Sequence, residues 1–353
     1  MVTARPHLLH AVTTALDASP SRMVVLTGPT GAGRTSTLHA LRALRGTAQT
    51  CLVPVDRLAT TPERFLEGLA AAGLATRAPA SVGARAAFDA AMDALAEPHA
   101  TTGGPVLVLL DEFLELRTFD SFPHLRGATQ ECVERLAASG HPCVLTSRFS
   151  ARAMQLLAPF GDRVASVELP PLTVAEVTAA LQMDGATPDG ASSLAETVQA
   201  LTLGHPAYVA AMAEALLLGR HDAHRGGDDP VSALAKLLQP DGRLARQCEF
   251  VYEWRLHRAR GYGALKEILH LLAEEDGLTL SEVARRLRRT PGSTKDYLLW
   301  LQDVDLIAAD RRRYRYADPL LRAWVRIYGQ ATPADDVAIV REVQRFALSR
   351  LSP

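Results

Sequence analysis

A glycine-rich run near the N-terminus has the residue types that bind phosphate. Gly28-Pro29-Thr30-Gly31-Ala32-Gly33-Arg34-Thr35 follows an apolar stretch and leads into a helical pattern that begins at Ser36. In such a setting, backbone N–H groups and a helix N-terminus converge on phosphate oxygens, and glycines let the backbone approach the anion. The Thr35 hydroxyl is a suitable ligand for a phosphate-bound Mg²⁺. The run therefore predicts a P-loop whose residues 28–36 contact a nucleotide, although a glycine-rich turn without a ligand is the alternative.

Arg34 stands where the P-loop pattern has lysine. A guanidinium is wider than an ammonium and favours forked contacts, so we expect nucleotide binding to persist while hydrolysis slows. The chain has 38 Lys and Arg residues, of which only three are lysine. Arg34 is therefore either a product of this compositional bias or a residue around which the site is shaped. The sequence leaves both explanations open.

Two acidic residues end a second apolar run. Val106 to Leu110 are aliphatic, and Asp111 and Glu112 follow directly. Such a run suits a central strand that is buried on both faces, and its C-terminal end falls where open α/β sheets bind ligands. We expect Asp111 to hold Mg²⁺ and Glu112 to polarise the attacking water. The pattern is weak alone and gains weight from the P-loop upstream.

A third apolar run, Cys143 to Leu145, is followed by Thr146, Ser147 and Arg148. If this strand lies beside the P-loop strand, these side chains are near the γ-phosphate. A solvated arginine after a strand is the alternative interpretation of Arg148.

The elements that would position these residues alternate β-rich and helical runs through the first half, which predicts a parallel sheet in an α/β core. A helical lid and a C-terminal winged helix-turn-helix follow. We predict the domains 1–170 (P-loop core), 171–225 (helical lid), 226–260 (helical linker), 261–330 (winged helix-turn-helix) and 331–353 (C-terminal helix). The expected strands are 23–27, 51–55, 106–110, 142–146 and 163–169; the expected helices are 36–44, 62–72, 84–96, 129–138, 174–182, 192–201, 207–218, 264–273, 281–289 and 293–302.

The predicted winged helix-turn-helix carries the densest group of basic residues. Two short β-like pieces, 306–309 and 314–317, bracket a basic turn after the third helix, whose Leu298 and Leu301 supply core residues. Thr294, Lys295 and Trp300 are expected to face elsewhere. Duplex DNA is one expected partner, since phosphate contacts supply most sequence-independent affinity; packing on the chain's own nucleotide domain is the alternative. The candidate DNA contacts are Lys295, Arg311, Arg312, Arg313 and Arg315.

Composition narrows the class of protein. The 353 residues are 48% hydrophobic, with a net charge of -1. No apolar stretch is long enough for a membrane span and no signal segment is visible, so we expect a cytoplasmic protein with no membrane partner. The four cysteines are widely spaced, which suggests buried apolar side chains instead of a zinc site or disulfides.

The three polar elements, with Gly204-His205-Pro206 and the C-terminal module, resemble the STAND class of AAA+-related ATPases, particularly the archaeal-type ATPase family. The resemblance spans nearly the whole chain. It implies ATP or ADP with Mg²⁺ as cofactors, Arg148 as a γ-phosphate sensor and Pro206 as an adenine contact. His205 either reaches a phosphate or caps the lid helix, and we favour the cap.

Two further segments belong to the resemblance. Residues 2–9 look like the N-terminal motif of the class, but lack its glycine before Arg5 and its acidic residue afterwards. Asp318 and Pro319 match the end of the family's winged helix, and by residue type they are a helix N-cap and a first-turn proline. The lid has no match to the arginine of ring-forming AAA+ machines, which favours a STAND protein.

These features lead to a signalling ATPase as the first hypothesis, in which ATP·Mg²⁺ binding and slow hydrolysis reposition the lid and winged helix. The second hypothesis is a nucleotide-dependent DNA-binding regulator or loader with little turnover. The third is a scaffold that recruits a separate effector protein. No nuclease, protease or transferase constellation is visible.

Overall fold

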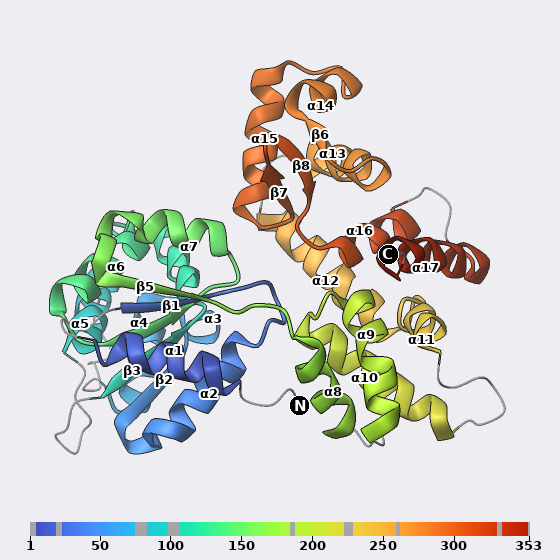
Figure 1. Ribbon diagram of the computed structural model, residues 1–353. Helices are drawn as coiled ribbons and strands as arrows, with labels where there is room; N and C mark the ends of the chain where they lie inside the picture. The colour runs from blue at the N-terminus through green and yellow to red at the C-terminus, as the bar shows by residue number, and fades with distance from the viewer. Residues whose placement is uncertain are drawn as a thin grey trace. The chain divides into compact units, whose positions relative to one another are not determined.

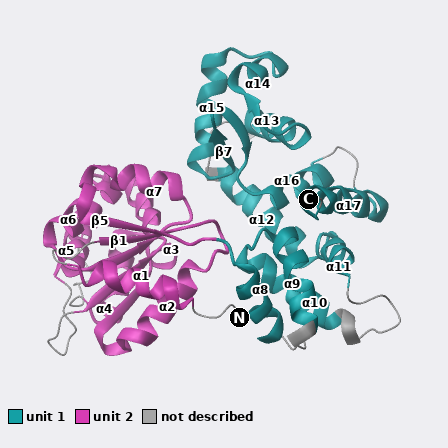
Figure 2. Cartoon of the chain, in the orientation of Figure 1, with its two compact units in different colours: residues 1–3, 171–353 teal, residues 4–170 magenta. Residues whose placement is uncertain are grey.

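The chain forms two compact units in a computed structural model (Figures 1 and 2). One unit comprises residues 4–170, and the other comprises residues 171–353 with residues 1–3. The structure describes residues 5–18, 23–74, 83–97, 106–183, 188–221, 229–258, 262–329 and 334–351.

The unit of residues 4–170 is built on a five-stranded parallel sheet with the order β2-β3-β4-β1-β5. The P-loop strand β1 pairs with β4 on one side and β5 on the other, as the sequence predicted for β4. Each strand is within one residue of the expected position at both ends. The strands are β1 (Met23–Thr27), β2 (Thr50–Pro54), β3 (Leu107–Asp111), β4 (Cys143–Thr146) and β5 (Val164–Glu168).

Helices pack on this sheet through apolar side chains. Leu8 and Val12 of α1 and Leu38 of α2 join Val24 of β1 and Val144 of β4 in one buried core cluster. A group of aromatic rings joins α4, α5 and η2 by edge-to-face packing; its members are Phe65, Phe88 and Phe119. The helices are α1 (Pro6–Leu16), α2 (Arg34–Arg45), η1 (Thr47–Gln49), α3 (Val55–Leu58), α4 (Pro62–Ala71), α5 (Ala84–Ala96), η2 (Phe113–Ser121), α6 (Ala128–Ser139), α7 (Ser150–Leu157) and η3 (Ala158–Arg163).

The other unit is helical apart from a small antiparallel sheet. Helix α10 continues to His221, three residues beyond the expected end at residue 218. None of the helices among the described residues is long and apolar enough to cross a bilayer. The elements are α8 (Val174–Met183), α9 (Pro188–Thr202), α10 (Pro206–His221), α11 (Pro230–Leu237), α12 (Arg243–Arg258), α13 (Tyr262–Glu274), β6 (Leu278–Thr279), α14 (Leu280–Arg286), α15 (Pro291–Asp303), β7 (Ile307–Asp310), β8 (Arg313–Tyr316), α16 (Pro319–Tyr328) and α17 (Asp336–Leu351).

Residues 262–316 contain three helices and a three-stranded sheet with the order β6-β8-β7. Leu298 and Leu301 are fully buried, as expected. The expectation that Thr294 faces away is wrong, because its side chain is buried and its hydroxyl donates to the Thr290 carbonyl. The second helix also ends earlier than predicted, since the backbone turns left-handed at Arg288 (φ 52°).

A tight contact joins the start of α10 to the segment before α8. Gly204 has φ 65°, and a Cβ at this position would lie 2.4 Å from the Leu172 carbonyl oxygen. The Leu172 N–H donates to the Gly204 carbonyl at 2.7 Å. Glycine is therefore required before His205 by backbone conformation and by close approach.

The predicted cap at Asp318 is confirmed. Its carboxylate accepts hydrogen bonds from the N–H groups of Leu320 and Leu321, and Pro319 occupies the first turn of α16. The same carboxylate also accepts from the hydroxyl of Tyr208, a buried side chain on α10. Asp318 therefore links α16 to α10 in addition to capping α16.

Candidate functional site

The P-loop passes from the C-terminal end of β1 into the first turn of α2. Gly33 (φ 97°) is the N-cap residue of α2, and no side chain caps this helix end. Gly28 (φ 152°) lies close to its neighbours, because a Cβ there would be 3.2 Å from the Cβ of Ala32 and 3.3 Å from that of Leu169. The loop thus has the left-handed and close-packed backbone positions that glycine permits.

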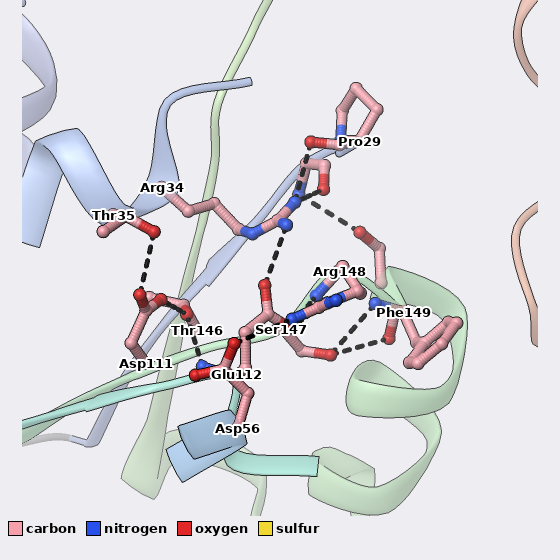
Figure 3. Close-up of polar contacts among 12 residues, drawn as sticks. Pro29, Arg34, Thr35, Asp56, Asp111, Glu112, Thr146, Ser147, Arg148 and Phe149 are labelled. Atoms are coloured by element: carbon pink, nitrogen blue, oxygen red, sulfur yellow. Dashed lines mark hydrogen bonds and ion pairs between the residues drawn. The ribbon is translucent and has the colours of Figure 1, made fainter. Parts of the chain in front are cut away.

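A chain of hydroxyls and a carboxylate joins the loop to β3 and β4 (Figure 3). The Thr35 hydroxyl donates to Asp111 Oδ2 at 2.8 Å, and the Thr146 hydroxyl donates to Asp111 Oδ1 at 2.5 Å. Thr146 Oγ1 also accepts from the Glu112 N–H at 2.9 Å. Both oxygens of Asp111 are therefore oriented by hydroxyls, and Thr146 fixes both acidic residues.

Glu112 is held by two arginines in a sterically unfavourable backbone conformation. Its φ of 59° and ψ of 48° place a non-glycine residue in the left-handed region, which is uncommon and often found at functional sites. Oε1 lies 3.0 Å from Arg34 Nη2, and Oε2 lies 3.0 Å from Arg148 Nε. The Arg148 backbone N–H also donates to Oε2 at 2.9 Å.

Burial and charge act in opposite directions on Glu112. Burial alone would raise the pKa of its carboxyl, but the charges of Arg34 and Arg148 and the hydrogen bonds from Arg148 outweigh burial and lower the pKa. Glu112 is therefore held ionised, with a cation on each oxygen.

Arg34 is buried, with 6% of its surface exposed. Its Nη1 donates to the carbonyl oxygens of Gly28 and Pro29, the second at 2.7 Å, while Nη2 contacts Glu112. Its buried Nε has no hydrogen-bond partner among the described residues. The guanidinium thus bridges the P-loop backbone and β3, and one of its N–H groups is left unsatisfied.

Arg148 is anchored from two sides. Besides its contacts with Glu112, its Nη2 lies 3.6 Å from the Asp56 carboxylate, which follows β2 at the start of α3. Ser150, two residues further on, accepts a hydrogen bond from the Gly28 N–H at 3.1 Å. The segment after β4 therefore contacts both Glu112 and the beginning of the P-loop.

The structure brings together four of the site residues that the sequence singled out around the P-loop and β3. Arg34 contacts Glu112, Thr35 contacts Asp111, and Arg148 joins them through Glu112. The remaining loop residues, Pro29 to Gly33, lie between β1 and α2, and Ser36 is exposed in the first turn of α2.

The other candidate residues belong to the unit of residues 171–353. Pro206 is buried in the first turn of α10, and the carbonyl of His205 accepts from the Tyr208 and Val209 N–H groups, as a cap does. Residues 2–4 of the predicted N-terminal motif lie outside the described residues, and Pro6 begins α1. Lys295 is exposed on α15, whereas Arg311, Arg312, Arg313 and Arg315 are exposed on the β7–β8 hairpin.

Three contacts of this site were not predicted from sequence. Asp56 and Ser150 were not singled out, and Thr146 was expected near a phosphate, whereas here it orients Asp111 and Glu112. The position of Thr146 at the end of a buried strand beside β3 could have indicated its contacts with Asp111 and Glu112. Asp56 had no such signal, since it follows an edge strand in a short helix.

Comparisons with known proteins show the fold. Neither a scan of family models nor a search of curated proteins found a match. The Walker-type ATPase paby2304 of Pyrococcus abyssi is similar in structure, with a TM-score of 0.62 and 16% identity, over 93% of this chain and 96% of that one. Two variants of RuvB from Thermotoga maritima match with TM-scores of 0.42 and 0.45 at 14% identity, over 94% of this chain and 96% and 97% of theirs. The chain has the α/β fold of Walker-type P-loop ATPases.

Proposed function

We propose that this protein is a switch ATPase that binds ATP with Mg²⁺ at residues 28–36 and hydrolyses it slowly. The observation that carries the proposal is the contact of Thr35 with Asp111, 2.8 Å between the P-loop hydroxyl and the carboxylate at the end of β3. These are the two oxygen ligands that a phosphate-bound Mg²⁺ needs from a P-loop protein.

Two features of the chain fit this ligand. Oxygen donors of Thr35 and Asp111 suit a hard cation, and the uncapped N-terminus of α2 with the unsatisfied Nε of Arg34 suits phosphate oxygens. When bound, Mg²⁺ would neutralise charge on the phosphates. The chain's own residues would bind and orient the triphosphate through the P-loop backbone, Arg34 and Thr35.

Slow hydrolysis follows from the contacts of Glu112. A general base must accept a proton from water, but both carboxylate oxygens of Glu112 contact arginines. The two positive charges make Glu112 a weaker base, so turnover should speed up when at least one arginine contact is lost. Arg148, next to Glu112, is a reasonable group to stabilise charge on the γ-phosphate.

The unit of residues 171–353 would respond to the nucleotide state. The resemblance to STAND proteins supports a role for the lid, with Pro206 at the adenine, and for the winged helix-turn-helix in a conformational switch. In such a protein, binding and hydrolysis alter the position of these parts, and a separate effector protein receives the signal.

An alternative, a nucleotide-dependent DNA-binding regulator or loader, is favoured by one observation. Arg311 and Arg312 form the exposed two-residue turn between β7 and β8, where they are free to reach a phosphate backbone. This function would need measurable affinity for duplex DNA.

Site variants test the proposal through the different tasks of the two acids. We expect Asp111→Asn to weaken Mg²⁺-dependent ATP binding, because a metal ligand loses its charge. Glu112→Gln should bind ATP at least as tightly as the wild type and lose turnover, because the base is absent. Titration with a fluorescent ATP analogue and steady-state phosphate release, each with and without duplex DNA, measure both.

Glu67→Gln, an exposed residue of α4, is the matched control and should behave as the wild type. Absence of ATP binding by the wild type would refute the proposal. Equal turnover by the wild type and Glu112→Gln would remove Glu112 from the mechanism.

A further inference from the structure

We propose that Arg34 is a latch on Glu112: its guanidinium holds the base inactive, and a nucleotide phosphate releases Glu112 by drawing the guanidinium away. This inference rests on the proposed function and adds a regulatory step to it. Arg34 would thus act on the base as a positioning residue, in addition to contacting phosphate.

The contacts of Arg34 account for its function as a latch. Nη1 and Nη2 reach three acceptors, which are the carbonyls of Gly28 and Pro29 and the carboxylate of Glu112. A lysine ammonium cannot span two carbonyls on the loop and a carboxylate on another strand with the same planar fork. These contacts support the explanation in which the site is shaped around a guanidinium.

The unsatisfied Nε of Arg34 favours a phosphate as the new partner of its guanidinium. A buried polar N–H without a partner is energetically unfavourable, and Arg34 Nε is in this position while the rest of its guanidinium is bonded. A phosphate oxygen in the P-loop would supply the missing acceptor, and the triphosphate as a whole carries more negative charge than the Glu112 carboxylate. Binding of a triphosphate therefore competes directly with the Arg34–Glu112 ion pair.

The second arginine at Glu112 is better suited to stay in place. Arg148 contacts Oε2 through both its side chain and its backbone N–H, and Asp56 lies 3.6 Å from its guanidinium. Loss of Arg34 would leave Oε1 free to accept a proton while Oε2 remains oriented. The two arginines thus have different tasks: movement of Arg34 frees Oε1, whereas Arg148 continues to hold Oε2.

A double-mutant cycle on nucleotide affinity tests the latch without relying on turnover. Glu112→Gln should tighten binding of a fluorescent ATP analogue with Mg²⁺, because it frees the guanidinium for phosphate. In the Arg34→Met protein there is no guanidinium to free, so Glu112→Gln should raise nucleotide affinity only by removing a negative charge near the phosphates. We expect Glu112→Gln to raise the ATP affinity by a factor that is about fivefold or more larger when Arg34 is present than in Arg34→Met.

The matched control cycle uses Arg45→Met and Glu67→Gln, which alter a partly exposed arginine of α2 and an exposed acid of α4. These two changes should act independently. Equal tightening by Glu112→Gln in both Arg34 backgrounds would overturn the latch. Arg34→Gln replaces Arg34→Met if the latter does not fold, as judged by circular dichroism.

Melting temperatures without nucleotide provide a separate measurement of the ion pair. Arg34→Met and Glu112→Gln should have non-additive effects, because each removes the same buried contact. Additive effects would overturn the latch even if ATP binds. Non-additive effects in a protein that does not bind ATP would instead refute the proposed function and the release by phosphate, and would leave only a structural ion pair.

Discussion

The Thr146 hydroxyl forms hydrogen bonds with both acidic residues of the site. It donates to Asp111 Oδ1 at 2.5 Å and accepts from the Glu112 N–H at 2.9 Å, and the residue is fully buried. A group that orients a metal-binding carboxylate usually affects metal affinity, because it fixes the direction of the ligand oxygen. Thr146 is thus a candidate for supporting both acids without contacting the nucleotide.

We expect Thr146→Val, which has nearly the same shape, to raise the Mg²⁺ concentration required for half-maximal ATP binding by about tenfold or more. The physical reason is that Asp111 loses an orienting donor and the Glu112 N–H loses a buried acceptor. Titrating Mg²⁺ at fixed ATP analogue measures the shift, and Thr146→Ser should restore most of the affinity.

Thr202→Val is the matched control, since Thr202 is also fully buried and its hydroxyl donates only to the Val198 carbonyl in α9. This variant should lower the stability of the protein without changing the Mg²⁺ concentration required for half-maximal ATP binding. The same Mg²⁺ dependence in Thr146→Val and wild type would assign Thr146 a purely structural role.

At the scale of the elements, the β7–β8 hairpin closes with a left-handed turn. Asp310 pairs with Arg313, so Arg311 and Arg312 form a two-residue connection, and their φ angles are 47° and 65°. Positive φ at both positions is characteristic of a type I′ turn, which favours Asn-Gly. Arginine is therefore conformationally unfavourable here, which is consistent with a use for its charge.

The turn geometry allows the charge to be removed without damaging the hairpin. We expect the double variant Arg311→Asn, Arg312→Gly to retain or increase thermal stability, because both residues suit a type I′ turn. If the hairpin contacts duplex DNA, the affinity should fall, and the slope of log affinity against log salt should decrease by up to about two. Fluorescence anisotropy at several salt concentrations measures both quantities.

Arg313 is left unchanged because its Nη1 donates to the Gly277 carbonyl at 2.8 Å and supports the hairpin. Arg57→Ala, a change outside this module, controls for the loss of a basic residue elsewhere. Unchanged affinity and salt slope in the double variant would exclude the turn as a DNA contact.

The elements also show what could be predicted from sequence. Strand β1 was predicted to the residue because its five buried residues are followed directly by the glycine-rich loop, and helix α5 was predicted to the residue by its helical spacing. Strand β6 was missed, because two residues, Leu278 and Thr279, are too few for an alternating pattern. Helix α14 was predicted too long, since nothing in an arginine-rich run signals the left-handed turn at Arg288.

The candidate site also contains features that could be predicted from the sequence and features that could not. The loop and the acidic pair were predictable because local spacing defines them, as in the run from Gly28 to Thr35. The contact of Arg34 with Glu112 was not, because it joins residues 78 positions apart through a side chain whose usual partner is a phosphate. Asp56 was missed for the same reason, since only the sheet order β2-β3-β4 brings it near Arg148.

At the scale of the whole molecule, the cysteines provide a probe in each unit. All four are buried, as the sequence predicted: Cys51, Cys132 and Cys143 lie in the unit of residues 4–170, and Cys248 lies in the other. Burial raises the pKa of Cys132 and of Cys143 to about 12, and also raises those of Cys51 and Cys248. Because the thiolate is the reactive form, these thiols should react only after their unit opens.

We expect pulsed alkylation at pH 8 to leave all four thiols unmodified in the native protein, and to modify them in graded denaturant as each unit unfolds. Saturating ATP·Mg²⁺ should move the modification of Cys51, Cys132 and Cys143 to higher denaturant, because Arg34, Thr35 and Asp111 belong to their unit. At a nucleotide concentration 100 times the dissociation constant, the stabilisation is about 2.7 kcal/mol. Mass spectrometry of each cysteine peptide reads the result.

Cys248 serves as the internal control, and its response decides whether the unit of residues 171–353 takes part in nucleotide binding. If the nucleotide contacts only the unit of residues 4–170, the modification of Cys248 should stay at the same denaturant concentration. A shift at Cys248 equal to that of the other three would support the prediction that His205 and Pro206 also bind the nucleotide, since their unit contains Cys248. A shift at none of the four, at saturating ATP·Mg²⁺, would contradict the proposed binding site, because a ligand that binds the folded state must stabilise it.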